Sequence, residues 1–171
     1  MSKQVPFATT AQVRDTCLCL HVQRAARVLA RRFDEALRPV GLTSGQFSLL
    51  NALNRPEPPA IGPVAELLAM DRTTLTAALK PIERDGLVTV AEDPNDRRSR
   101  LLRLTGKGKR VLASAIPIWL EAHAAIESGL VGLEPDHLRD ALKSLSARRG
   151  GASAKASAPR SARGAVRTAG A

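Results

Sequence analysis

Apolar side chains recur every three or four residues between Ala11 and Leu37, and polar or charged side chains fill most positions between them. This spacing places the apolar residues on one stripe of an α-helix. They are Leu18, Val22, Ala25, Leu29, Phe33 and Leu37. Proline and glycine follow at positions 39 and 41 and end the pattern. We therefore expect one long helix over about 11–38, about 40 Å in length. A helix of this length extends beyond the side of a small domain, which favours packing against a second subunit in a dimer.

Signals for shorter helices follow. Thr43 and Gln46 have the spacing of a capping box, and the helix that they start ends before a run containing three prolines. A second short helix begins near Pro63. Asp71 is placed as the N-cap of a third, and Gly86 supplies its stop. Pro81 inside this third helix is expected to weaken or kink its C-terminal half.

The pattern then changes to short apolar runs. Segments 87–90 and 101–104 predict two strands, and Pro94, Asn95 and Asp96 between them favour a turn. Two short helices joined by a tight turn and followed by a basic hairpin predict a winged helix-turn-helix over about 43–105. The fold class is therefore mostly α (α+β).

Two further helices are predicted after the hairpin. Thr105 is expected to cap the first, and Pro117 to kink it. Trp119 and His123 lie one turn apart on this helix, where core packing and an effector cleft are both consistent with the pattern. Pro135 favours the first position of the final helix.

The net charge of the chain indicates what kind of partner it binds. The chain has 171 residues and a net charge of +10, which indicates an anionic partner such as nucleic acid or an acidic membrane surface. Segment 148–171 contains six basic residues and no acidic one. It is poor in large apolar side chains, so we expect a basic disordered tail. Attraction of DNA and simple solubilisation are both open roles for it.

Several protein classes are disfavoured. No apolar run reaches the roughly 18 residues of a membrane span, and segment 1–10 lacks the apolar core of a signal peptide. We therefore expect a cytoplasmic protein with no membrane partner. The sequence has no phosphate-binding glycine loop, nucleophile–base pair or metal-ligand cluster, so neither an enzyme nor a cofactor is predicted. A metal site that combines His21 with Cys17 or Cys19 across a dimer is the alternative.

The DNA-contacting residues follow from the fold. In a helix-turn-helix the second helix enters the major groove, and its first turns contact base edges and phosphates. The candidates there are Arg72, Thr73, Thr74, Thr76 and Lys80. Arginines on a projecting hairpin suit phosphates and the minor groove.

Arg98 is the leading candidate on the hairpin for minor-groove contact. Arg97 and Arg100 are its expected phosphate-binding neighbours. Asp96 is expected either to cap the turn and orient Arg98, or to act as a turn residue alone.

The order of these elements resembles the MarR family of bacterial transcriptional regulators. The resemblance is carried by segments 42–50, 70–76, 79–88, 93–98 and 104–108. It implies a domain over 1–147 and a homodimer joined through helices at about 11–38 and 106–147. It also implies binding to double-stranded DNA at a pseudo-palindromic operator, usually as a repressor that a small molecule or cysteine oxidation releases.

Segment 19–27 is similar to the first helix of the organic-hydroperoxide-sensing branch of that family, and Cys19 matches its reactive cysteine. Tyrosines support that cysteine in the branch, whereas this chain has no tyrosine and has Gln23 where one is expected. Redox sensing by Cys19, with Cys17 nearby, and a buried unreactive thiol are the two interpretations.

Ala77 and Ala78 occupy positions where relatives often have basic or amide side chains. Base recognition is then expected to rely on the threonines, on water or on thymine methyl groups. Two alternative functions follow. One is a redox- or ligand-sensing module that acts through protein partners, and the other is a sequence-tolerant DNA binder.

Overall fold

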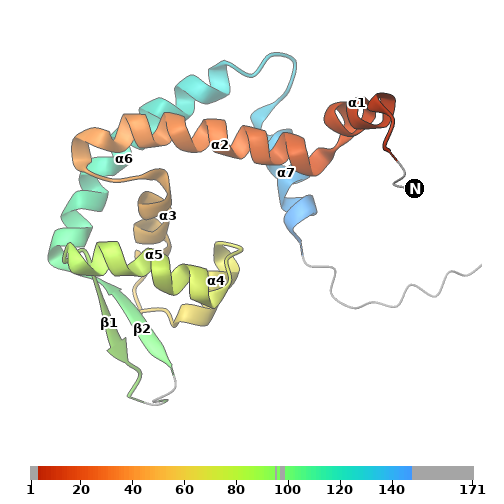
Figure 1. Ribbon diagram of the computed structural model, residues 1–171. Coiled ribbons are helices and arrows are strands. Elements are labelled where there is room, and N and C mark those ends of the chain that lie inside the picture. Colours follow the sequence, from red (N-terminus) through yellow and green to blue (C-terminus); the bar gives the residue numbers. More distant parts are fainter. Residues whose placement is uncertain (1–3, 95, 97–98, 148–171) are drawn as a thin grey trace, which may run out of the picture. The chain divides into compact units, whose positions relative to one another are not determined.

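The computed structural model describes residues 4–94, 96 and 99–147, which form helices and one two-stranded sheet (Figure 1). The mostly helical fold class is confirmed. The helices are α1 (Phe7–Thr16), α2 (Leu18–Leu37), the short 3-10 helix η1 (Arg38–Val40), α3 (Ser44–Leu53), α4 (Ile61–Leu67), α5 (Arg72–Arg84), α6 (Gly106–Ser128) and α7 (Pro135–Ser146). The strands are β1 (Val88–Glu92) and β2 (Arg100–Leu104). The chain divides after Pro135 into two compact units.

The prediction of one continuous N-terminal helix is wrong. The helix begins earlier, at Phe7, and breaks at Cys17, whose ψ of 104° is extended. Asp, Thr and Cys all have low helix propensity, and they stand together at 15–17. The Thr16 hydroxyl donates to the carbonyl of Gln12 at 2.8 Å. The Asp15 carbonyl lies 3.2 Å from Nε2 of His21.

The core of the first unit is mostly aliphatic, with Phe47 as its buried aromatic residue, and lies between the helix-turn-helix, the sheet and the start of α6. Its fully buried side chains include Leu50, Leu75, Ile82 and Leu102. Leu37, at the end of α2, is also fully buried. The other buried residues of α3, α5 and β2 belong to the same cluster, so α5 and the base of the hairpin pack against one core.

Three of the predicted helix caps are confirmed. Thr43 and Gln46 form the capping box, and Asp71 caps α5 by accepting a hydrogen bond from the backbone of Thr74. Thr105 caps α6. These caps satisfy backbone N–H groups that have no partner inside the helix.

Neither internal proline ends its helix. α5 continues past Pro81 to Arg84. α6 contains Pro117 and changes direction part-way along its length in Figure 1.

The hairpin is joined closely to the helices at its base. β1 and β2 pair antiparallel, with Val88 opposite Leu104 and Glu92 opposite Arg100. On the other edge of β2, the backbone N–H of Leu102 donates to the carbonyl of Pro59 at 2.9 Å. This bond brings the segment before α4 beside the hairpin. The hairpin projects beyond the helices of the first unit (Figure 1).

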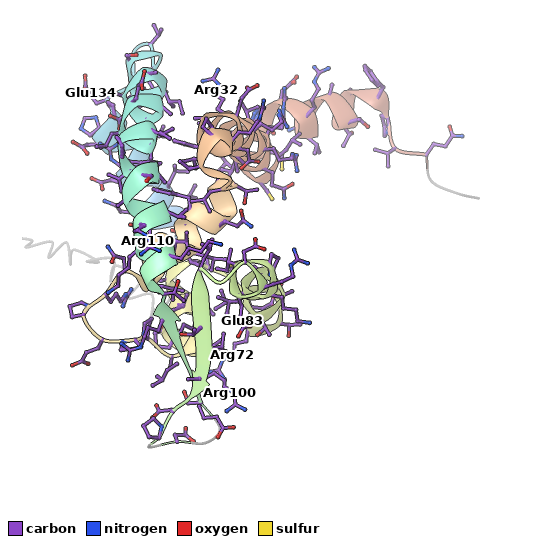
Figure 2. All side chains as sticks on the ribbon, turned by 90° about the vertical axis from the view of Figure 1, so that its left-hand side faces the viewer. Arg32, Arg72, Glu83, Arg100, Arg110 and Glu134 are labelled. Atoms are coloured by element: carbon purple, nitrogen blue, oxygen red, sulfur yellow. The ribbon has the colours of Figure 1, made fainter. Side chains whose placement is uncertain are left out.

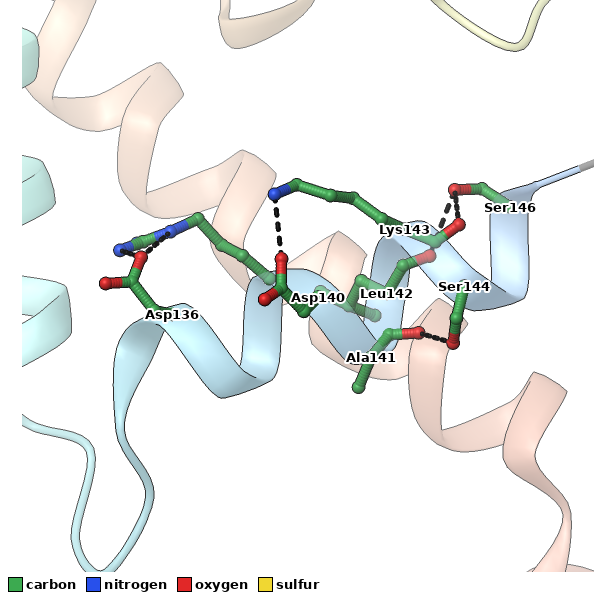
Figure 3. A network of polar contacts seen from close by, with 8 residues as sticks. Asp136, Asp140, Ala141, Leu142, Lys143, Ser144 and Ser146 are labelled. Atoms are coloured by element: carbon green, nitrogen blue, oxygen red, sulfur yellow. Dashed lines mark hydrogen bonds and ion pairs between the residues drawn. The ribbon is translucent and has the colours of Figure 1, made fainter.

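α7 carries short-range ion pairs along its surface (Figure 3). Arg139 contacts Asp136 at 2.6 Å and Lys143 contacts Asp140 at 2.9 Å. The hydrogen bond from Arg139 lowers the pKa of the Asp136 carboxyl. α7 has no buried residue. None of the described helices is long and apolar enough to cross a membrane.

Candidate nucleic-acid interface

α5 presents one buried face and one exposed face. Leu75, Leu79 and Ile82 are buried. Arg72, Thr73, Thr74, Thr76, Ala77 and Lys80 are exposed. The burial pattern therefore leaves every predicted residue of this helix accessible to a partner.

Asp71 fixes the first turn of α5. Its carboxylate accepts hydrogen bonds from the Thr74 backbone N–H at 2.8 Å and from the Thr74 hydroxyl at 2.6 Å. These bonds, the hydroxyl first, lower the pKa of Asp71. They hold the carboxylate against the helix start, where the helix dipole also favours negative charge.

A groove of about 420 Å³ lies between the start of α4, the first turns of α5 and the hairpin. Four of the predicted residues line it together, although they are up to 28 positions apart in sequence. They are Arg72, Thr76, Asp96 and Arg100. Figure 2 shows Arg72 and Arg100 on the same side of the molecule, near the hairpin. Lys80, Thr73 and Thr74 do not line this groove.

Gly62, which was not among the predicted site residues, makes room for Arg72. A Cβ atom at Gly62 would lie 3.2 Å from Nη2 of Arg72, which is tighter than ordinary packing. The guanidinium therefore lies over the start of α4. Ser99 also lines the groove. Neither residue has a sequence signal for this role, because the contacts join separate elements.

Backbone hydrogen bonds join the described residues of the hairpin tip. The backbone N–H of Asp96 donates to the carbonyl of Asp93 at 3.2 Å, and that of Ser99 donates to the carbonyl of Asp96 at 2.8 Å. Arg97 and Arg98 lie outside the described residues. Arg100 forms an ion pair of 3.1 Å with Glu92, its cross-strand neighbour. This pair holds the Arg100 guanidinium beside the groove.

Known proteins are similar to this chain in sequence and in fold. The MarR family's sequence model matches residues 40–99. The transcriptional regulator MosR of M. tuberculosis, solved in complex with DNA, is 35% identical, with a TM-score of 0.70 over 76% of this chain and 93% of MosR. The organic hydroperoxide resistance transcriptional regulator of Bacillus subtilis is 30% identical over 59% of this chain and 69% of its own length. The chain belongs to the MarR family.

A further relative is the transcriptional activatory protein BadR of Rhodopseudomonas palustris, which is 36% identical over 97 residues. The match covers 55% of this MarR-family chain and 55% of BadR. The chain thus spans only about half the length of this curated relative.

A second cavity of this MarR-family chain, about 400 Å³, lies between α2, α3, α4 and α6. Phe33, Phe47 and Trp119 line it together with aliphatic residues, and Ser48 and Asn51 add polar groups. The Trp119 ring stacks on Phe47 with 6.0 Å between centroids. Trp119 therefore both packs against the core and lines a cavity.

The two cysteines of the MarR-family chain differ in environment. Cys19 is exposed, and its Sγ accepts a hydrogen bond of 3.2 Å from Nε2 of Gln23. Cys17 is half-buried at the break between α1 and α2. Both thiols are free. Among the described residues no group of three or more His, Cys, Asp or Glu side chains is arranged to hold a metal ion.

Proposed function

We propose that this chain is a sequence-specific, DNA-binding transcriptional regulator that acts as a homodimeric repressor. The groove that collects Arg72, Thr76 and Arg100 beside the exposed start of α5 carries the proposal. Two guanidinium groups beside a helix suited to the major groove can bind phosphates and position the helix against base edges. The DNA-bound relative MosR supports the same assignment.

The proposal is tested by fluorescence anisotropy with the duplex from upstream of the chain's own gene and with a scrambled duplex. We expect a preference of roughly 10³-fold at near-physiological salt. Arg72→Ala should weaken binding to the upstream duplex, whereas Arg38→Ala, an exposed arginine outside the interface, should not. Equal loss in both variants would contradict the assigned interface.

The hairpin arginine Arg98 is proposed to enter the minor groove. Arg98→Ala should weaken binding to the preferred duplex by about 1–3 kcal/mol, the range for a good specific contact. An unchanged dissociation constant at matched salt would remove Arg98 from the interface. Lys80, Arg97 and Asp96 are proposed as supporting residues of the same surface.

The homodimer is supported by an uncovered apolar stripe on α2. Phe33 and Leu37 pack into or against the core, but Leu18, Val22 and Leu29 remain exposed. Apolar stripes of this kind are typical of protein interfaces. A two-fold dimer would place two copies of α5 on a pseudo-palindromic operator.

The releasing signal is proposed to be a small molecule in the cavity beside Trp119. Aromatic and aliphatic walls with a few polar groups suit a small aromatic ligand. Trp119 is the sole tryptophan, so its fluorescence reports occupancy directly. Titration with benzoate should change the emission and weaken DNA binding over one concentration range; a change in neither would reject benzoate as the ligand.

Oxidation of Cys19 is the second proposed signal, supported by its exposure and by the amide hydrogen bond from Gln23. Peroxide should weaken DNA binding of the unmodified chain and leave Cys19→Ser unaffected, with Cys17→Ser as the matched control. Equal peroxide sensitivity in all three proteins would reject the proposal.

A sequence-tolerant DNA binder is the second candidate function, because Ala77 gives the exposed face of α5 no hydrogen-bonding group at that position. Salt dependence separates the two candidates. Weak, steeply salt-dependent and equal binding to both duplexes would favour this alternative.

A further inference from the structure

The exposed side of α5 is centred on Thr73 and Ala77. Successive helical residues are about 100° apart, and the buried residues Leu75, Leu79 and Ile82 define the inner side of the helix. Thr73 and Ala77 lie almost opposite them. Thr76 is turned toward the groove with Arg72, and Ala78 lines a cavity on the other flank.

The threonine hydroxyls on both flanks already donate their protons within the helix. The Thr74 hydroxyl donates to the Asp71 carboxylate at 2.6 Å, and the Thr76 hydroxyl donates to the carbonyl of Arg72 at 2.7 Å. Each hydroxyl has a single proton. Neither therefore donates to the N7 or O6 acceptors of purines while these bonds persist.

Over the first two turns of α5, the groups at the centre of this face are largely apolar, whereas the exposed cations Lys80 and Arg84 follow on the same side further along the helix. Ala77 offers only a methyl group, and Thr73 offers a methyl group and a hydroxyl. In the major groove the C5-methyl of thymine is the apolar feature that distinguishes one base from the others. A methyl surface of this kind packs against that methyl and gains little from guanine or cytosine.

We propose that α5 recognises thymine C5-methyl groups through the methyl groups of Thr73 and Ala77. This inference rests on the proposed DNA-binding function and specifies what the interface recognises. Each half-site should contain a thymine opposite these residues. Burying one methyl group against another corresponds to about a fourfold change in affinity.

The test begins with selection of preferred sequences from a randomised duplex library by the full chain. Each thymine of the preferred duplex is then replaced, one at a time, by deoxyuridine, which keeps the base pair and removes only the methyl group. We expect about fourfold weaker binding at one or two thymines in each half-site and no change elsewhere.

Three variants test whether the weaker binding of deoxyuridine duplexes depends on the methyl groups of α5. Thr73→Ser and Ala77→Gly each remove one methyl group, and Thr73→Ser retains the hydroxyl. Thr16→Ser is the matched control, because Thr16 is an exposed helical threonine with the same type of hydroxyl–carbonyl bond as Thr76. The measured quantity is the affinity ratio between the thymine and deoxyuridine duplexes for each protein, so a change in the variant's stability largely cancels.

The ratio should fall toward one in Thr73→Ser or Ala77→Gly at the contacted thymine and remain fourfold in Thr16→Ser. A ratio of one at every thymine for the unmodified chain would overturn the inference while leaving sequence-specific binding intact. An unchanged ratio in both Thr73→Ser and Ala77→Gly would also overturn it. Failure of the library to yield any preferred sequence would instead reject the proposed function, and the inference with it.

Discussion

Among the described glycines, Gly108 leaves the least room for a side chain. A methyl group there would overlap the backbone carbonyl of Leu87, which cannot move as a flexible side chain would. The same carbonyl accepts the backbone N–H of Thr105 at 3.0 Å. We expect Gly108→Ala to lower the free energy of unfolding by about 1–3 kcal/mol, the cost of overpacking, measured by urea denaturation.

Gly106 supplies the control for that substitution. It lies on the same turn of α6, but a methyl group there would meet only the Arg110 guanidinium at 3.6 Å, an ordinary contact. Gly106→Ala should change stability by no more than about 0.5 kcal/mol. Similar losses in both variants would show that the overlap with the Leu87 carbonyl does not set the effect, because helix propensity favours alanine over glycine at both positions.

Sequence and structure agree best at residues whose role is local. Thr43, Asp71 and Thr105 cap helices by bonding groups three positions away, so spacing alone predicts them. Gly62 and Gly108 act through contacts with Arg72 and Leu87 on other elements. No local pattern specifies such contacts, and only the fold shows which residues meet.

At the scale of elements, the N-cap of α5 predicts a dependence of stability on pH. Hydrogen bonds from Thr74 hold the folded-state pKa of Asp71 below its ordinary value of 3.8. The carboxylate therefore stabilises the fold above pH 3.8, and this contribution is lost as the pH falls through the lower, folded-state pKa. Asp71→Asn keeps a good capping residue and removes the titration.

Urea denaturation at several pH values measures this contribution of the Asp71 carboxylate to stability. Between about pH 5 and about pH 2, the unmodified chain should lose more stability than Asp71→Asn, because only the former must protonate this carboxyl group. At pH 7 the two proteins should be similarly stable, since Asn and Asp cap about equally well. Parallel pH profiles would mean that Asp71 does not contribute to acid unfolding.

The break between α1 and α2 shows what periodicity leaves out. Apolar residues keep a helical spacing across the C-terminal part of the predicted helix, and α2 follows it from Leu18 to Leu37. Periodicity reports which side of an element is apolar, whereas three adjacent poor helix formers at 15–17 decide where the backbone leaves the helix. The hairpin was easier to predict, because the turn residues lie between two short apolar runs and both signals indicate a hairpin.

At the scale of the whole molecule, the proposed dimer depends on the exposed stripe of α2. Leu18 is 67% exposed, and Val22 and Leu29 follow on the same side of the helix. We expect Val22→Glu with Leu29→Glu to raise the dimer dissociation constant at least about tenfold, because a carboxylate would be buried without a partner. Thr89→Glu, at an exposed position of β1 outside the predicted dimerisation helices, should leave it unchanged. Sedimentation velocity distinguishes the species; an unaltered dimer in the double variant would place the interface elsewhere.

The distribution of charge along the chain supports a final prediction, on the share of DNA affinity that is independent of sequence. Segment 148–171 contains six of the 26 basic residues and none of the 16 acidic ones, so its removal lowers the net charge by six. If the tail contacts phosphates, each contact displaces a counterion and steepens the fall of affinity with salt.

A chain ending at residue 147 should then show a shallower salt dependence on specific and scrambled duplexes alike. The preference between the duplexes should persist, because base contacts belong to α5. An unchanged salt dependence would assign the tail no role in DNA binding, and a lost preference would move part of base recognition from α5 to the tail.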